Sequence, residues 1–211
     1  MSFSLNEVEA TAKKATRGAG YHWGLAEEAG KAVRWLCAHG VDGCGALAEA
    51  LGKFDGASLS NITPATNSSE WYATGRTLCP LMTGTALSDR VDAIQNSPIR
   101  ASRVAAPNLL LFFAANMAAH CKSVVTLEWP GGFAVTNGSD LCINGRPAGS
   151  FASVVRVLCG GTLGAPVSTS TRAEPAATVW KTLNTFAHRT YAPATEESRL
   201  KGAGAGTTDR D

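Results

Sequence analysis

The sequence predicts an α+β fold with N-terminal helices, a central and mostly antiparallel sheet with a buried helix, and a C-terminal helix followed by a tail. Apolar residues recur at helical spacing near both ends of the chain, whereas residues 124–159 alternate as strands do. Strands and helices do not alternate as βαβ units require. We therefore expect one α+β domain over residues 1–211, with a loop excursion at 55–75 and a glycine-rich tail at 202–211.

The first helix is predicted from its N-terminal cap. Ser4 and Glu7 have the spacing of a capping box, in which each side chain accepts a hydrogen bond from the other residue's backbone N–H. A helix should run from there to about Thr16, and Gly18 and Gly20 should end it.

A second helix should start near Gly24, with Glu27 placed to bind Lys31 one turn later. Its apolar stripe consists of Leu25, Ala29, Ala32, Val33 and Leu36. Gly43 should help to close this helix, and residues 46–54 read as a short third helix.

The middle of the chain is less clear. Residues 55–75 are polar and should form a long loop whose end is held by Trp71 and Tyr72. We favour one or two strands around the segments RTLCPLM and ASRVAA. A proline then suits the first turn of a buried helix over residues 107–120.

The clearest strand signal is the segment VVTLEW, in which the residues facing opposite sides alternate. Two Asn-Gly pairs favour hairpin turns after it, and FASVVRVLCGG supplies a further strand, so an antiparallel sheet or meander is expected. Val179, Leu183 and Phe186 share one face of a later helix, and Thr195 could cap a short final one.

Composition narrows the function classes. The chain has 19 Lys and Arg against 17 Asp and Glu, without a basic block, so we expect neither a nucleic-acid nor a membrane partner. Residues 1–25 lack an export signal, and the most apolar run, 109–119, is far shorter than the roughly 20 residues of a membrane span. Six scattered cysteines fit reduced thiols, so a cytoplasmic protein is predicted.

The glycine-rich polar segment TRGAGYHWGLAEEAG, residues 16–30, is the first candidate for a functional site. Its glycines allow a tight turn with exposed N–H groups, and the helix start after it favours an anion. An arginine there can hold a carboxylate, and a histidine can transfer protons near neutral pH. The alternative is that the glycines only stop a helix and that the aromatic residues anchor the core.

The C-terminal segment HRTYAPATEESRLKGAGAG repeats this chemistry, although a solvated last helix with a frayed tail is an alternative interpretation. Our hypothesis is that the two ends meet and that the tail closes one polar cleft. The expected catalytic residues are His22, His188, Glu27 and Glu28, where a histidine is the acid/base and a glutamate orients it. The expected substrate-binding residues are Arg17, Gly18, Gly20, Tyr21, Trp23, Arg189, Tyr191 and Arg199, with Arg17 or Arg199 as the anion anchor.

A metal or cofactor site has weaker support. Cys37, His39 and Cys44 lie close in sequence, but structural zinc needs four ligands and a fourth is not apparent, so core thiols are favoured. GAGAG is not a dinucleotide-binding motif, because it follows no strand. We therefore expect no cofactor and no resident metal.

The segments ATRGAGYHWGLAEEAGKAVRWL and FAHRTYAPATEESRLKGAGAG resemble a bacterial family of about this length that is described only as a domain of unknown function. The resemblance covers nearly the whole chain and implies one integral domain. It implies no activity, cofactor or catalytic residue.

Together these observations predict a cofactor-independent enzyme that performs acid/base chemistry, such as isomerisation, elimination or hydrolysis, on a small anionic, carboxylated metabolite. The first alternative is a non-catalytic ligand-binding or accessory subunit of a metabolic enzyme, with the central sheet and residues 55–75 as partner surface. The second is a metal-dependent hydrolase or lyase that uses His22, His188 and nearby carboxylates. A homo-oligomer or a partner enzyme subunit is a further expectation.

Overall fold

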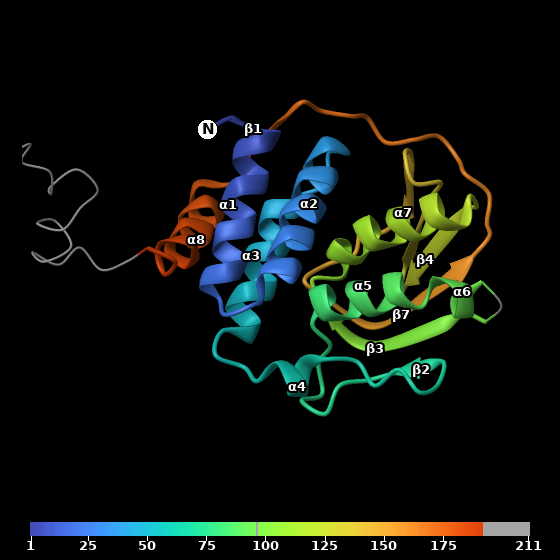
Figure 1. The fold of residues 1–211 in the computed structure, drawn as a ribbon. Helices are drawn as coiled ribbons and strands as arrows, with labels where there is room; N and C mark the ends of the chain where they lie inside the picture. Colours follow the sequence, from blue (N-terminus) through green and yellow to red (C-terminus); the bar gives the residue numbers. More distant parts are fainter. Residues whose placement is uncertain (96, 192–211) are drawn as a thin grey trace, which may run out of the picture.

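Four helices pack side by side next to a sheet that further helices cover on one face (Figure 1). This computed structural model describes residues 1–95 and 97–191 and shows an α+β arrangement. The four helices are α1 (Leu5–Gly18), α2 (Trp23–Ala38), α3 (Gly43–Phe54) and α8 (Ala177–His188). The expected cap at Thr195, Arg199 and the tail 202–211 lie outside the described residues.

The predicted capping box starts α1. The Ser4 side chain accepts a hydrogen bond from the Glu7 backbone N–H at 3.2 Å, and the Glu7 carboxylate accepts one from the Ser4 N–H at 3.0 Å. The helix ends at Gly18, two residues beyond the expected end. The cap therefore fixed the start, whereas the end depends on packing that is described below.

Helix α2 buries the predicted apolar stripe, although Leu25 is only partly buried. The expected pair of Glu27 with Lys31 is wrong. Lys13 of α1 binds Glu27 at 2.7 Å, and Lys31 binds Glu28 at 2.7 Å. The reason is tertiary, because α1 lies alongside α2 and brings its Lys13 to Glu27, which leaves Lys31 to Glu28.

Gly43 does not close α2 but begins α3. Asp42 caps α3 by accepting a hydrogen bond from the Gly45 N–H at 2.8 Å. A Cβ on Gly43 would lie 2.8 Å from the Val33 carbonyl oxygen, so the glycine allows α3 to approach α2 closely.

The polar excursion 55–75 contains the short helix α4 (Leu59–Ile62) and strand β2 (Glu70–Trp71). Trp71 is buried and holds this segment as expected, whereas Tyr72 is 55% exposed and does not. The Trp71 indole N–H donates to the Ser68 carbonyl oxygen at 3.0 Å.

The strand expected around RTLCPLM is wrong. Pro80 occupies the first position of helix α5 (Pro80–Asp89), where its missing N–H costs no hydrogen bond, and the short helix α6 (Val91–Ile94) follows. Leu78 makes only an isolated bridge to Val104. The strand expected around ASRVAA is confirmed as β3 (Ile99–Ala105).

The six-stranded sheet has the order β2-β3-β7-β4-β5-β6, and only the β2–β3 pair is parallel among its neighbouring strands. Its later strands are β4 (Val125–Trp129), β5 (Gly132–Thr136), β6 (Leu141–Gly145) and β7 (Phe151–Cys159). The expected antiparallel meander is therefore confirmed in β4-β5-β6. A separate pair, β1 (Phe3–Ser4) with β8 (Arg172–Ala173), joins the start of α1 to the segment before α8.

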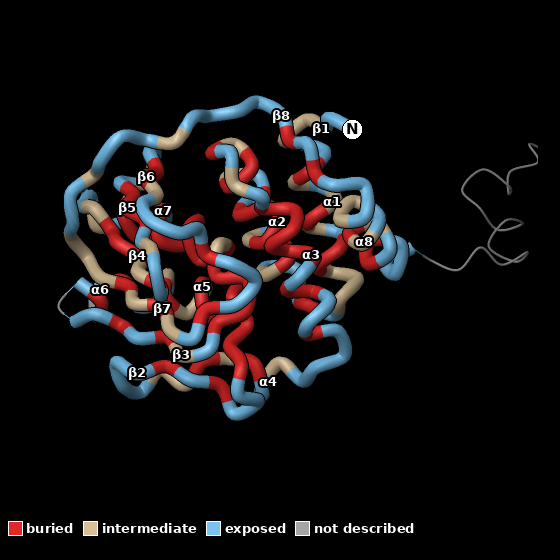
Figure 2. Tube along the Cα trace, turned by 180° about the vertical axis from the view of Figure 1, so that it is seen from behind, coloured by how far each residue is buried: buried red, intermediate tan, exposed pale blue. Residues whose placement is uncertain are grey.

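The expected buried helix is α7 (Leu110–Cys121), which follows a 3₁₀ turn, η1 (Pro107–Leu109). It packs with α5 beside the sheet and also contacts α2. The buried apolar side chains form one cluster that extends from the four helices to the strands (Figure 2). Within the described ranges, no helix combines the length and apolarity that a membrane crossing requires.

Candidate functional site

The end of α8 lies against the end of α1, which brings the described parts of the two predicted site segments together (Figure 1). A Cβ on Gly18 would collide with the Phe186 carbonyl oxygen, so the helices meet with no side chain between them. The Lys14 ammonium lies 5.9 Å from the centre of the Tyr191 ring. The expected closure by the tail concerns residues outside the described part of the chain.

The turn between α1 and α2 is held by Arg17. Its guanidinium donates to the Tyr21 carbonyl oxygen at 2.8 Å and lies 5.3 Å from the centre of the Trp23 indole. Gly20 has a positive φ of 94°, which a glycine adopts without strain. Arg17 therefore stabilises the turn, in addition to any role with an anion.

Tyr21 was expected to line the pocket, and this expectation is wrong. Its side chain is 2% exposed, and its hydroxyl lies 3.3 Å from the Cys79 sulfur. Burial raises the pKa of the Tyr21 phenol and of the Cys79 thiol. Tyr21 is a core anchor, whereas its neighbour Trp23 stays 58% exposed.

Arg189 was expected to bind a substrate through a free guanidinium, and this expectation is wrong. It makes two hydrogen bonds to the Asp55 carboxylate, at 2.6 and 2.9 Å. This pairing holds the pKa of Asp55 below its usual range. His188 is exposed and its ring packs against Tyr191, with 5.2 Å between ring centres.

His22 is the exposed N-cap residue of α2 and makes no capping hydrogen bond with its side chain. Glu27 binds Lys13 and not a histidine, so its expected orienting role has no geometric support. The expected site residues therefore lie close together only in part. The two expected carboxylates pair with lysines and not with a histidine, Glu27 with Lys13 and Glu28 with Lys31.

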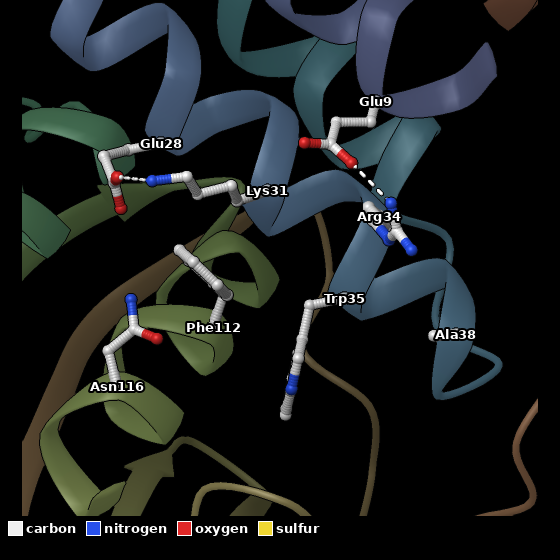
Figure 3. A pocket seen from close by; sticks show the side chains of 8 residues that line it. All are labelled: Glu9, Glu28, Lys31, Arg34, Trp35, Ala38, Phe112 and Asn116. Atoms are coloured by element: carbon white, nitrogen blue, oxygen red, sulfur yellow. Dashed lines mark hydrogen bonds and ion pairs between the residues drawn. The ribbon is translucent and has the colours of Figure 1, made fainter. Parts of the chain in front are cut away.

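A cleft of about 580 Å³ lies between α2 and α7 (Figure 3). We call it the α2–α7 cleft. Eight residues line it, namely Glu9, Glu28, Lys31, Arg34, Trp35, Ala38, Phe112 and Asn116. Its volume is in the range of small-molecule sites in proteins. Glu28 is the predicted site residue that lines it, whereas His22 and Trp23 do not line this cleft.

The cleft has an apolar wall below a charged rim. The Trp35 and Phe112 rings lie 6.4 Å apart, and Trp35 also packs on His39 with 4.0 Å between ring centres. At the rim, Lys31 binds Glu28, and Arg34 binds Glu9 at 2.8 Å (Figure 3). Such a surface can hold an apolar group and a charged group of one ligand at once.

Sequence reasoning missed most of this cleft, because its two walls are 74 or more positions apart in the chain, from Ala38 to Phe112 at the nearest. One signal was present. Asn116 is a polar residue inside the run LLLFFAANMAA, and the structure places it, exposed, at the cleft. A polar side chain in an otherwise apolar helix marks the face that is left uncovered.

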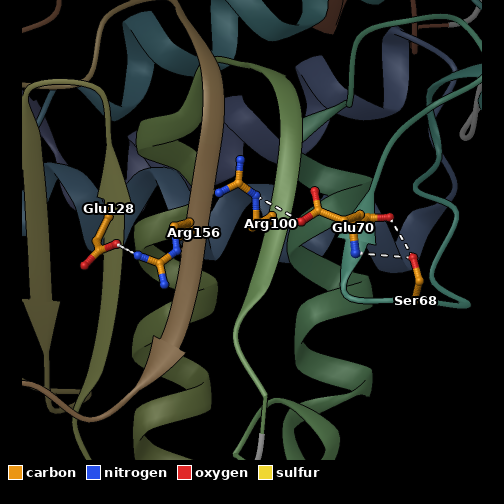
Figure 4. Close-up of polar contacts among 5 residues, drawn as sticks. All are labelled: Ser68, Glu70, Arg100, Glu128 and Arg156. Carbon is orange, nitrogen blue, oxygen red and sulfur yellow. Dashed lines mark hydrogen bonds and ion pairs between the residues drawn. The ribbon is translucent and has the colours of Figure 1, made fainter.

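The sheet carries a second charged surface on the face turned away from α5 and α7 (Figure 4). Arg100 and Arg156 lie opposite each other on β3 and β7. Each binds a glutamate on the strand at its other side, β2 for Arg100 and β4 for Arg156. The pairs are Arg100 with Glu70 at 3.0 Å and Arg156 with Glu128 at 2.7 Å. These four charges are therefore paired within the chain.

Metal ligands do not gather in the described ranges, where no group of three or more His, Cys, Asp and Glu side chains is placed to hold an ion. Both ring nitrogens of His39 are already occupied. One lies 2.8 Å from the Trp35 carbonyl oxygen and the other 2.9 Å from the Ser139 carbonyl oxygen, so neither is free to bind a metal. The metal-dependent alternative thus has no ligand set in the described residues.

The fold and the cleft define a class, an α+β protein with a ligand-sized cleft between its N-terminal helices and a sheet-covering helix. Residues 3–79 match the model of a family described as "Protein of unknown function (DUF3726)". The expected resemblance to an uncharacterised family is confirmed over this segment, which contains one wall of the cleft but not α7. A search of curated proteins finds no match to the chain.

Proposed function

We propose that the chain binds a small carboxylated metabolite with an apolar body in the α2–α7 cleft. The observation that carries this proposal is the position of two cations, Lys31 and Arg34, directly above the apolar wall of Trp35 and Phe112. A carboxylate would bind the cations while the apolar body covers the rings. Burying that body supplies about 25 cal/mol per Å² of apolar surface.

The two ion pairs of the rim leave room for such a ligand. The side chains of Lys31 and Arg34 are 54% and 47% exposed. Exposed ion pairs contribute only about 0–1 kcal/mol, so a ligand carboxylate can replace a glutamate at small cost. The displaced Glu9 or Glu28 would then suit a positively charged group, which favours a zwitterion.

Binding fits this cleft better than acid/base catalysis. The hydrogen bond of Lys31 to Glu28 raises the pKa of Lys31, so its ammonium stays protonated and cannot accept a proton near neutral pH. Neither His22 nor His188 lines the cleft.

The test is a thermal-shift and calorimetric comparison of three probes with one ring and different charges. L-phenylalanine should stabilise the purified chain most, 3-phenylpropanoate less, and 2-phenylethylamine least. A probe at 100 times its dissociation constant should raise the free energy of unfolding by about 2.7 kcal/mol. Equal shifts with all three probes, or none with the two carboxylates, would contradict the proposal.

Two variants locate the binding. Arg34→Gln should weaken the carboxylate probes about tenfold, because a charge-assisted hydrogen bond is lost. Arg156→Gln is the matched control, since Arg156 is also an exposed, ion-paired arginine but lies on the sheet. Ala38→Leu should reduce affinity by filling the cleft. Equal affinity of the two arginine variants would place the ligand elsewhere.

A cofactor-independent acid/base enzyme acting on a carboxylated metabolite is the second candidate. The close contact of Gly18 with Phe186 favours it, because this contact holds the segments of His22 and His188 at one end of the helical group. If a bound probe or metabolite is converted, His22→Ala and His188→Ala should lower kcat strongly and change KM little. Unchanged kcat in both variants would remove this candidate and leave the binding proposal intact.

A further inference from the structure

Two cysteines meet where α2 turns into α3. Cys37 is in the last turn of α2 and Cys44 in the first turn of α3, and their sulfur atoms lie 4.0 Å apart. Both are free thiols, with Cys37 7% exposed and Cys44 1% exposed. The turn between the helices therefore builds a dithiol in which one sulfur is more accessible than the other.

The dithiol forms part of the wall of a cavity of about 400 Å³. The opposite wall comes from the segment around β8, which supplies Arg172 and Glu174. Arg172 is fixed there by hydrogen bonds to the Ser2 hydroxyl at 2.7 Å and the Ser2 carbonyl oxygen at 2.9 Å. A small molecule in this cavity can reach the edge of Cys37.

The surroundings of the two sulfurs give them different chemistry. The Cys44 thiol and the backbone N–H groups of Gly43 and Cys44 donate hydrogen bonds to Cys37, which lowers the pKa of Cys37. Burial and the negative charge of Asp42 oppose this effect. Its hydrogen bond to Cys37 raises the pKa of Cys44, so Cys37 is the more acidic thiol of the two.

We propose that Cys37 and Cys44 form a redox pair in which Cys37 reduces a small hydroperoxide and Cys44 then closes an intramolecular disulfide. The Cys37 thiolate attacks the outer oxygen of the hydroperoxide, so that an S–O bond forms and the O–O bond breaks. The alkoxide leaves and takes up a proton as the alcohol. Cys37 becomes a sulfenic acid, oxidised by two electrons, while the peroxide is reduced by two.

In the second step Cys44 loses its proton and its sulfur attacks the Cys37 sulfur. The S–S bond forms as the S–O bond breaks, and the hydroxide leaves with that proton as water. The sulfurs must close from 4.0 Å to about 2.05 Å, the length of a disulfide bond. The net reaction converts two thiols and one hydroperoxide into a disulfide, an alcohol and water.

The low exposure of Cys37 selects a small oxidant. A protein disulfide could not bring its sulfur in line with a thiolate that is 7% exposed, whereas a hydroperoxide needs only to present one oxygen. Asp42, Arg172 and Glu174 all line the cavity, so charges of both signs are present and a neutral reagent is favoured over a strongly charged one.

The test is oxidation of the purified chain with stoichiometric hydrogen peroxide, followed by alkylation and tryptic mass spectrometry. Cleavage after Arg34 and Lys53 places both cysteines in the peptide 35–53. This peptide should become lighter by two hydrogens and lose both alkylation sites, and a dithiol reductant should restore them. Cys44→Ser should trap a sulfenic acid on Cys37, labelled by dimedone at least about tenfold more than Cys142 in the same sample.

The chain contains its own comparison pair. Burial and the neighbouring Cys121 raise the pKa of Cys159, and both thiols are more exposed than Cys37. Peptide 35–53 should be oxidised before the peptides of Cys121 and Cys159. Earlier oxidation of that pair, or retention of two free thiols in peptide 35–53, would overturn the proposal. These results come from the unsubstituted chain and do not depend on whether a variant folds.

Discussion

The two junctions among the first three helices are built alike but used differently. Residues 19–22 join α1 to α2, and residues 39–42 join α2 to α3. Each has a glycine with positive φ at its second position, Gly20 at 94° and Gly40 at 68°. The first junction is rich in polar and aromatic residues, and we predicted the functional site there.

The difference lies in what covers each turn. At the first junction His22 and Trp23 are exposed, and Tyr21 alone points into the core. At the second junction, His39 is buried and a nitrogen of its ring contacts the Ser139 carbonyl oxygen. The Ser170 backbone N–H donates a hydrogen bond to the Ala38 carbonyl oxygen at 2.8 Å. The second turn thus lies beneath a later part of the chain, which encloses a cavity and a thiol pair. Residue types alone do not reveal such covering.

The largest expected contrast is between two aromatic residues close in sequence, Tyr21 in the first junction and Trp23 at the start of α2. Tyr21→Ala should lower the free energy of unfolding by about 3–5 kcal/mol, because it leaves a cavity in the core. Trp23→Ala should cost less than about 1 kcal/mol, since the side chain is exposed and only its contacts with cations are lost. Denaturant unfolding measures both, and equal losses would contradict the assigned burial.

The two glycines that flank the first junction, Gly18 at the end of α1 and Gly24 at the start of α2, give the next contrast. Gly18→Ala should destabilise the chain by about 2–3 kcal/mol, because its Cβ meets the backbone of α8 at Phe186 and the helices must separate. Gly24→Ala, in open space at the start of α2, should be neutral or stabilise by up to about 1 kcal/mol. A tolerated Gly18→Ala would show that α8 does not rest on α1.

The capping residues test the two junctions directly. Asp42→Ala should cost about 1 kcal/mol, because the Gly45 N–H loses its acceptor. His22→Ala should change the free energy of unfolding very little, since the His22 side chain makes no capping hydrogen bond. Asp42→Asn, which keeps an acceptor, serves as the control. A larger loss for His22→Ala than for Asp42→Ala would reverse our assignment.

The smallest expected effect concerns pH and the Asp55–Arg189 pair. The folded pKa of Asp55 lies below its unfolded value, so its contribution is full above the ordinary carboxyl range and is lost as pH falls through the folded pKa. Asp55→Asn should lower the melting temperature at neutral pH by no more than about 2 °C and leave it unchanged at the acid end. A loss that grows toward low pH would have the wrong sign.

Local patterns predicted most elements of this chain correctly. The capping box, the stripe of α2, the buried helix and the β4-β5-β6 meander each depend on residues within one or two turns of the chain. The failures have a common cause. RTLCPLM has strand-like composition, but Pro80 and the packing of α5 on α7 make its second half a helix.

The candidate sites were harder to predict than the fold. Of the predicted site residues, Glu28 of α2 lies in the α2–α7 cleft, but Phe112 and Asn116, which line the cleft with it, come from α7. Cys37 and Cys44 were interpreted as core thiols, which their burial supports, yet their sulfurs meet beside a cavity. Distances across the chain are set by packing, and one sequence does not contain them.

The amino-acid sequence by itself determined the capped start of α1, the apolar stripe of α2, the buried helix and the β4-β5-β6 meander, because caps, turn residues and apolar periodicity act between residues close along the chain. The tertiary structure alone decided which polar side chains face solvent, which carboxylate pairs with which cation, and which turn is covered. The physical reason is that burial, ion pairing and cavity formation depend on groups from distant segments, such as Lys13 for Glu27 and β8 for Cys37.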